Sequence, residues 1–94
     1  MTKAVYPAVI REDDGWFWAE FPDLPGCFGQ GGTLVECAKS ASDVLVTHLS
    51  AMEYDGVELP EPTTPKVDDG MMVAWFYADT SELEEVWESW DNDQ

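Results

Sequence analysis

The fold is decided by residues 12–36, EDDGWFWAEFPDLPGCFGQGGTLVE. Near the start of this stretch the pair Asp14-Gly15 separates two strand-like runs, and such a pair strongly favours a tight β-hairpin turn. Residues 22–26 then contain two prolines and a glycine, which favour a rigid loop. The stretch closes at Thr33, where a helix begins. This order predicts an α+β domain with a small antiparallel sheet and one packed helix.

Strands are expected on both sides of the hairpin. Residues 4–12 are apolar, partly β-branched and too short for a helix, so they predict the first strand. Pro7 interrupts this run, and it belongs at a strand start or edge because it cannot donate a ladder hydrogen bond. Residues 16–21 predict the second strand, and a brief third strand fits around residues 27–30.

The second strand is apolar on both faces, because side chains alternate along a strand. One face holds Phe17, Ala19 and Phe21. The opposite face holds Trp16, Trp18 and Glu20. The helix can cover only one of them. The other face needs a cover from either the C-terminal residues or a second subunit, since it would otherwise be an association site.

The helix begins after Thr33, an N-cap whose partner Glu36 completes a capping box. Apolar side chains at helical spacing form one stripe along it: Leu34, Cys37, Ala38, Ala41, Leu45, Leu49 and Met52. Gly56 lies just beyond and suits a left-handed C-cap. Residues 56–70 are rich in proline and acidic residues, which predicts an irregular connection. The apolar run of residues 71–78 predicts a fourth strand, buried on both faces for part of its length.

Composition limits the function. The chain has 94 residues, 45% of them hydrophobic, which is enough for the core of one domain. Twenty acidic residues face four basic ones, for a net charge of −16. Such a surface repels phosphate and suits a basic partner, so direct binding to nucleic acid or an anionic membrane is not expected. The sequence lacks both an apolar run of membrane-spanning length and a signal peptide, so a cytoplasmic location is expected.

Residues 79–94 hold seven acidic residues and no basic one. Ser81 and Glu84 match a second capping box. Apolar residues at helical spacing would line one side of a short helix: Leu83, Val86, Trp87 and Trp90. Because so short a helix is not stable alone, this side must dock on something. The charge run either keeps the protein soluble or mimics phosphate toward a basic RNA-binding groove.

One segment resembles the HicB antitoxin family: Phe21-Pro22-Asp23-Leu24-Pro25-Gly26-Cys27, followed by Gly32-Thr33-Leu34-Val35-Glu36 at the helix start. The stretch Leu59-Pro60-Glu61-Pro62 is also similar to that family, so the resemblance covers residues 4–79. It implies a truncated ribonuclease-H-like fold. It also implies that the chain binds and silences a small basic HicA-type toxin, an mRNA-cleaving ribonuclease.

Two parts are therefore expected: a HicB-like domain over residues 1–79 and an acidic amphipathic helix over residues 80–94. A DNA-reading element needs more chain and a basic face, so no separate DNA-binding domain is expected. The resemblance implies homodimerisation through the fourth strand, and a homodimer or a higher oligomer is expected. The alternative function is that of an orphan HicB-like protein that binds another basic protein as a nucleic-acid mimic.

Catalysis, cofactors and metals are not expected. The carboxylates are scattered rather than gathered on adjacent strands, as a two-magnesium site would require. One histidine, His48, and two cysteines, Cys27 and Cys37, supply neither a structural zinc site nor a catalytic triad. Both cysteines are expected to be small buried side chains, with a disulfide as the lesser option, and His48 a helix packing residue.

Partner contacts are predicted from side chains that supply contact area and from those that attract a basic partner. The candidates are Trp16, Trp18, Asp23, Glu84, Trp87, Glu88, Trp90 and Asp91. Other roles stay open: the tryptophans can pack within the chain or in a dimer, and Asp23 can be a turn residue.

Overall fold

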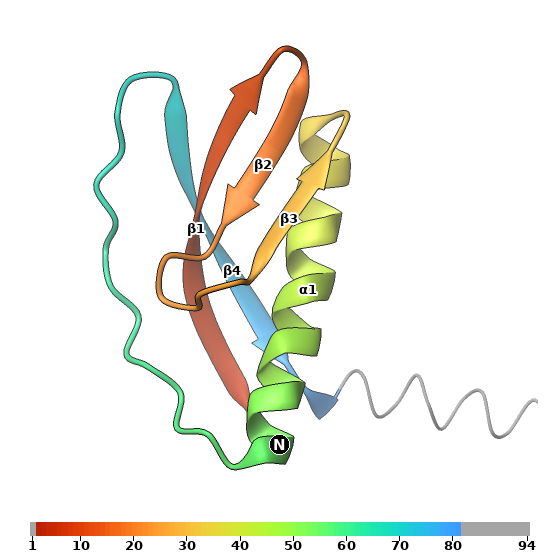
Figure 1. The fold of residues 1–94 in the computed structure, drawn as a ribbon, viewed down its shortest axis with the longest axis vertical. Helices are drawn as coiled ribbons and strands as arrows, with labels where there is room; N and C mark the ends of the chain where they lie inside the picture. The colour runs from red at the N-terminus through yellow and green to blue at the C-terminus, as the bar shows by residue number, and fades with distance from the viewer. Residues whose placement is uncertain (1, 82–94) are drawn as a thin grey trace, which may run out of the picture.

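A computed structural model describes residues 2–81 of the chain. These residues form β1 (Lys3–Asp13), β2 (Trp16–Glu20), β3 (Phe28–Gly31), α1 (Leu34–Asp55) and β4 (Met71–Asp79). The strands make one sheet in the order β3-β2-β1-β4, with every neighbouring pair antiparallel. Figure 1 shows α1 beside the sheet and the long connection from its end to β4. The predicted α+β class is confirmed, whereas the expected C-terminal helix lies outside the described residues.

The β1–β2 hairpin turns at Asp14 and Gly15, as predicted. Both residues have positive φ, 54° and 80°, and the strands pair on either side of them at Asp13 and Trp16. Two central residues with positive φ make a type I′ turn, whose twist matches that of the flanking strands.

Pro7 lies in the middle of β1, opposite Trp75. It is tolerated there because β2 pairs with β1 only from Val9 onward, so one side of β1 is open at Pro7. Along an antiparallel ladder, residue pairs that exchange backbone hydrogen bonds alternate with pairs that do not. Proline, which has no N–H, fits a pair of the second type. The N–H and C=O groups of Trp75 therefore point away from β1, toward the free edge of β4.

Helix α1 has both of the predicted caps. The Thr33 hydroxyl accepts a hydrogen bond from the Glu36 N–H at 3.1 Å. At the other end Gly56 adopts φ 71°, and the N–H groups of Gly56 and Val57 donate to the carbonyls of Glu53 and Met52. The buried residues of α1 belong to the predicted stripe: Cys37, Ala41, Leu45 and Leu49.

The core lies between α1 and one side of the sheet, which we call the inner face. Its members are Tyr6, Ala8, Ile10, Phe17, Ala19, Ala74, Phe76 and Ala78. Phe21 packs edge-on against Phe76, with ring centroids 5.6 Å apart, and Leu24 from the following loop is fully buried. The rigid loop therefore adds to the core as well as turning the chain.

Two glycines of β3 let α1 approach the sheet at backbone distance. A Cβ at Gly29 would lie 2.6 Å from Ala41 Cα, and a Cβ at Gly31 would lie 2.5 Å from the Cys37 nitrogen. Real Cβ atoms do not approach other atoms so closely. A larger residue at either position would push α1 away from the sheet.

One prediction about β4 is wrong. The strand is not buried on both faces, since Trp75 is 51% exposed and Tyr77 is 56% exposed. The reason is topological: β4 is an edge strand of the sheet, and α1 packs mainly over β3 at the opposite edge. In the part of the chain that the structure describes, no helix is long and apolar enough to span a membrane.

Replacing Gly29 by alanine tests the backbone contact between β3 and α1. We expect Gly29→Ala to lower the free energy of unfolding by about 1–3 kcal/mol, the usual range for overpacking. The measurement is urea denaturation followed by circular dichroism. Gly32→Ala is the matched control, because a Cβ at Gly32 would meet the Trp16 ring at an ordinary 3.5 Å. Equal losses in the two variants would contradict the close approach.

Candidate functional site: the outer face of the sheet

The side of the sheet opposite α1, which we call the outer face, is also apolar. Its residues follow from the strand register, because cross-strand partners point to the same side. The pairs Val5–Tyr77, Pro7–Trp75 and Val9–Val73 join β1 to β4. Trp16, Trp18, Phe28 and Met71 add to its apolar side chains. The same register also places polar residues on this face: Lys3, Arg11, Asp13, Glu20, Gln30 and Asp79.

The large side chains of the outer face are partly open to solvent. Trp16, Phe28 and Trp75 are each roughly half exposed, whereas Pro7 is fully buried among its neighbours. Large apolar side chains left half exposed on a small domain are typical of a site that another surface covers. Among residues 2–81, α1 covers one face of the sheet, and the second face is left partly open.

Acidic residues gather where the outer face meets the β1–β2 turn. This acidic end comprises Glu12, Asp13 and Asp69, which line one hollow, and their sequence neighbours Asp14 and Asp68. Part of it lines an open hollow of about 540 Å³, together with Trp18, Arg11 and Met71. Arg11 is paired with Glu20 at 3.1 Å. An aromatic ring beside several carboxylates suits a basic side chain, through charge attraction and cation–π contact.

The two edges of the sheet differ. At the β3 edge the outward N–H of Gln30 donates to Ser40 Oγ of α1 at 3.2 Å, so the helix protects that edge. At the β4 edge, every second backbone amide forms a hydrogen bond with β1, and the amides between them point away from the sheet. These outward amides belong to Val73, Trp75 and Tyr77. An edge with unpaired amides can accept another strand.

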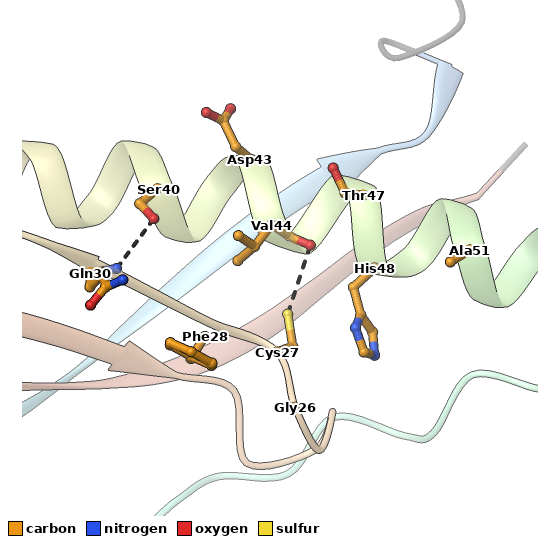
Figure 2. Close-up of a pocket in the computed structure, with 10 residues that line it drawn as sticks. All are labelled: Gly26, Cys27, Phe28, Gln30, Ser40, Asp43, Val44, Thr47, His48 and Ala51. Atoms are coloured by element: carbon orange, nitrogen blue, oxygen red, sulfur yellow. Dashed lines mark hydrogen bonds between the residues drawn. The ribbon is translucent and has the colours of Figure 1, made fainter.

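A second hollow, of about 610 Å³, lies between β3 and α1. Figure 2 shows the His48 ring pointing toward the turn at Gly26, and the Cys27 thiol directed at the Val44 carbonyl, 3.9 Å away. Burial raises the pKa of Cys27 to about 11, which keeps the thiol protonated. This hollow therefore lacks an activated nucleophile, and among residues 2–81 no group of three His, Cys, Asp or Glu could hold a metal ion.

Both cysteines are buried and free, as expected of small core side chains. Burial also raises the pKa of the Cys37 thiol. The alternative of a disulfide between Cys27 and Cys37 is wrong.

Hydrogen bonds fix the two ends of the described chain against α1. Thr2 and Thr80 exchange backbone and side-chain bonds of 2.8 and 2.9 Å. The hydroxyls of both threonines donate to Glu53 Oε2, at 2.6 and 2.8 Å, and these bonds lower the pKa of Glu53. The residues after Thr80 therefore leave the domain from a defined point, at the end of β4.

Two predicted site residues, Trp16 and Trp18, lie together on the outer face. Trp16 Nε1 donates to Gln30 Oε1 at 3.3 Å, and Trp18 lies beside the acidic end. Asp23 lies in the rigid loop. Its carboxylate accepts hydrogen bonds from the Thr63 N–H at 3.0 Å and the Thr63 hydroxyl at 2.6 Å, which ties the 57–70 connection to that loop. The other predicted residues lie outside the described residues: Glu84, Trp87, Glu88, Trp90 and Asp91.

The prediction missed several outer-face residues, namely Val5, Phe28, Trp75 and Tyr77. Alternation along each strand was visible in the sequence. Which side chains share a face becomes clear only when the register between β1 and β4 is known. That register is not readable from the sequence, because 57 residues separate the two strands.

Comparison with known proteins places this fold among antitoxins. Residues 6–83 match the family model of the HicB-like antitoxin of bacterial toxin–antitoxin systems. An uncharacterized protein from the rep–hol intergenic region of Haemophilus phage HP1 is 35% identical over 57 residues. That match covers 61% of this chain and 43% of the phage protein, so the chain spans less than half of that relative's length.

Solved structures share the fold. A chain of the HicA3–HicB3 toxin–antitoxin complex is similar with a TM-score of 0.63 and 29% identity, over 81% of this chain and 99% of that one. A chain of a toxin–antitoxin complex from Streptococcus pneumoniae is similar with a TM-score of 0.74, over 87% of this chain and 73% of that one. At 20% identity the second likeness supports the fold alone. Since the family model matches most of its length, the chain belongs to the HicB-like antitoxins of bacterial toxin–antitoxin systems.

Proposed function

We propose that this chain neutralises a small basic HicA-type mRNA interferase in the cytoplasm by masking the toxin's RNA-binding and catalytic surface. The observation that supports this most directly is the position of Trp18, on the apolar outer face and at the rim of the acidic end. Aromatic rings supply the contact area, and the carboxylates supply charge complementary to an RNA-binding groove. Binding alone blocks the toxin, and no bond is broken.

Charge acts mainly on the rate of encounter. With a net charge of −16, the chain attracts a basic protein over long range. This attraction raises the association rate and weakens as salt screens it. Desolvated aromatic side chains contribute most of the binding free energy at protein interfaces. We therefore propose that the acidic end raises the association rate and that the tryptophans contribute most of the binding free energy.

The C-terminal residues belong to the same proposal. Trp87 and Trp90 would add anchors on the toxin, and Glu84, Glu88 and Asp91 would face its basic groove. These residues follow β4, whose end is fixed against α1 by the Thr2–Thr80 pair and Glu53.

The first test is to purify the tagged chain from its own host at low salt and to weigh the complex by native mass spectrometry. We expect a small basic polypeptide to co-purify, to cleave RNA once separated, and to lose that activity when the chain is added back. A partner without ribonuclease activity, or a bare homo-oligomer, would refute toxin neutralisation.

With that toxin in hand, Trp18→Ala tests the outer face. We expect the Kd to rise at least about tenfold, the loss typical of a buried aromatic anchor. Tyr54→Ala is the control, because Tyr54 lies on α1 and is 92% exposed, so its removal should leave the Kd unchanged. Circular dichroism of both variants checks that the fold is intact. Equal affinities for Trp18→Ala and the parent chain would contradict the assigned face.

The chain is also proposed to form a homodimer through β4. This edge has unpaired amides, whereas α1 covers the edge at β3 through the Ser40–Gln30 bond. Two antiparallel β4 strands would join two sheets into one and place the two outer faces side by side. Edge strands that are long and apolar are otherwise an aggregation hazard.

Val73→Pro tests this pairing. The Val73 amide points away from β1, so proline removes an outward donor and leaves the β1–β4 bonds in place. We expect sedimentation equilibrium to show a monomer for Val73→Pro and a dimer for the parent chain and for the control Val73→Ala. A dimer that persists in the proline variant would show that the copies associate elsewhere.

A further inference from the structure

Large side chains of β4 are exposed on both faces of the sheet. Trp75 and Tyr77 are 51% and 56% exposed on the outer face. Met72 is 49% exposed on the inner face, where it lies opposite the core residue Ile10. A partner that covered only the outer face would leave Met72 in solvent. A strand added beside β4 covers side chains on both faces, so the pattern of exposure points to a missing neighbouring strand.

The backbone of β4 limits how a second copy of this strand can pair with it. The even-numbered residues bond β1, so the N–H and C=O groups of the odd-numbered residues point away from the sheet. In an antiparallel pair of two β4 strands, these outward residues must bond one another. The allowed registers therefore differ in steps of two residues.

Side-chain size on the inner face distinguishes these registers, because residues opposite each other on neighbouring strands are in contact. When Trp75 lies opposite Trp75 of the second copy, Ala74 faces the copy's Phe76. Met72 then faces the copy's Ala78, so each large side chain meets a small one. A slide of two residues pairs large with large and small with small: Met72 with Phe76 in one direction, and Phe76 with Phe76 in the other. Close packing excludes both arrangements.

The outer face favours the same register. Val73 faces Tyr77 of the second copy, and the two Trp75 rings lie side by side, as paired aromatic rings favour. Each exposed ring thereby gains an apolar neighbour. In one of the slid registers Asp79 lies opposite Asp69 of the copy, and like charges directly opposite are destabilising.

We infer that two copies pair their β4 strands antiparallel with Trp75 on the two-fold axis, which joins two four-stranded sheets into one. The occupant of the edge is a second copy because β4 is complementary to itself, as a two-fold interface requires. α1 does not obstruct the pairing, since it packs mainly over β3 at the opposite edge. The register rests on the proposed β4 homodimer, and it does not depend on the toxin.

A disulfide tests the register. In the double variant Val73→Cys with Tyr77→Cys, each new cysteine faces the other position of the second copy, with Cα atoms about 5.5 Å apart, within reach of a disulfide. We expect oxidation without toxin to give a linked dimer on a non-reducing gel. A slide of two residues would separate these Cα atoms by about 8 Å, which is too far. Trp75 is retained, and the native cysteines are buried.

The two single variants are the matched controls. A residue meets its own counterpart only on the two-fold axis, and position 73 lies about 13 Å along the strand from position 73 of the second copy. Neither Val73→Cys nor Tyr77→Cys alone should therefore link. Sedimentation equilibrium of the reduced double variant reports the dimer itself. A reduced dimer that does not link on oxidation, or linked single variants, would overturn the register and leave the β4 homodimer standing.

NMR of the parent chain gives a readout that needs no substitution. Val73 and Tyr77 of one chain are about 13 Å apart along β4, too far for a nuclear Overhauser contact. We expect such a contact between the Val73 methyls and the Tyr77 ring in a mixture of labelled and unlabelled chains, because the two residues meet across the interface. A dimeric parent chain without this contact would overturn the register. A monomeric parent chain would overturn both the register and the homodimer.

Discussion

The structure depends on the backbone contact between α1 and β3. Gly29 and Gly31 present no side chain, so the helix lies directly against the strand at Ala41 and Cys37. This contact sets the helix over one edge of the sheet and makes it cover the inner face. Every later feature follows from this asymmetry: the buried stripe of α1, the protected edge at β3 and the open edge at β4.

A sheet covered on one side by one helix has a second side to account for. Most antiparallel sheets of this size place polar residues there. This chain instead places Val5, Trp75 and Tyr77 there, half exposed, together with the less exposed Trp18, and it concentrates carboxylates at one end. An apolar surface with an acidic rim suits a basic protein partner. Because the chain belongs to an antitoxin family, we propose a toxin as that partner.

Local signals in the sequence were sufficient to predict the hairpin and the two ends of α1. Asp14-Gly15 predicted the hairpin, Thr33 and Glu36 the start of α1, and Gly56 its end, because turns and caps depend on a few adjacent residues. The burial of β4 was mispredicted, since an apolar run does not reveal whether a strand is central or at an edge. The outer face was only partly predicted, because it depends on the pairing of β1 with β4 across 57 residues.

The central claim is that the toxin binds at the outer face and the acidic end. Zero-length carbodiimide cross-linking of the purified complex tests it most directly, because it joins a carboxylate to a lysine only in direct contact. We expect cross-links from Glu12, Asp13 or Asp69 to lysines of the toxin. Cross-links confined to the exposed carboxylates of α1, such as Asp43 and Asp55, would contradict it and would move the interface to the helix.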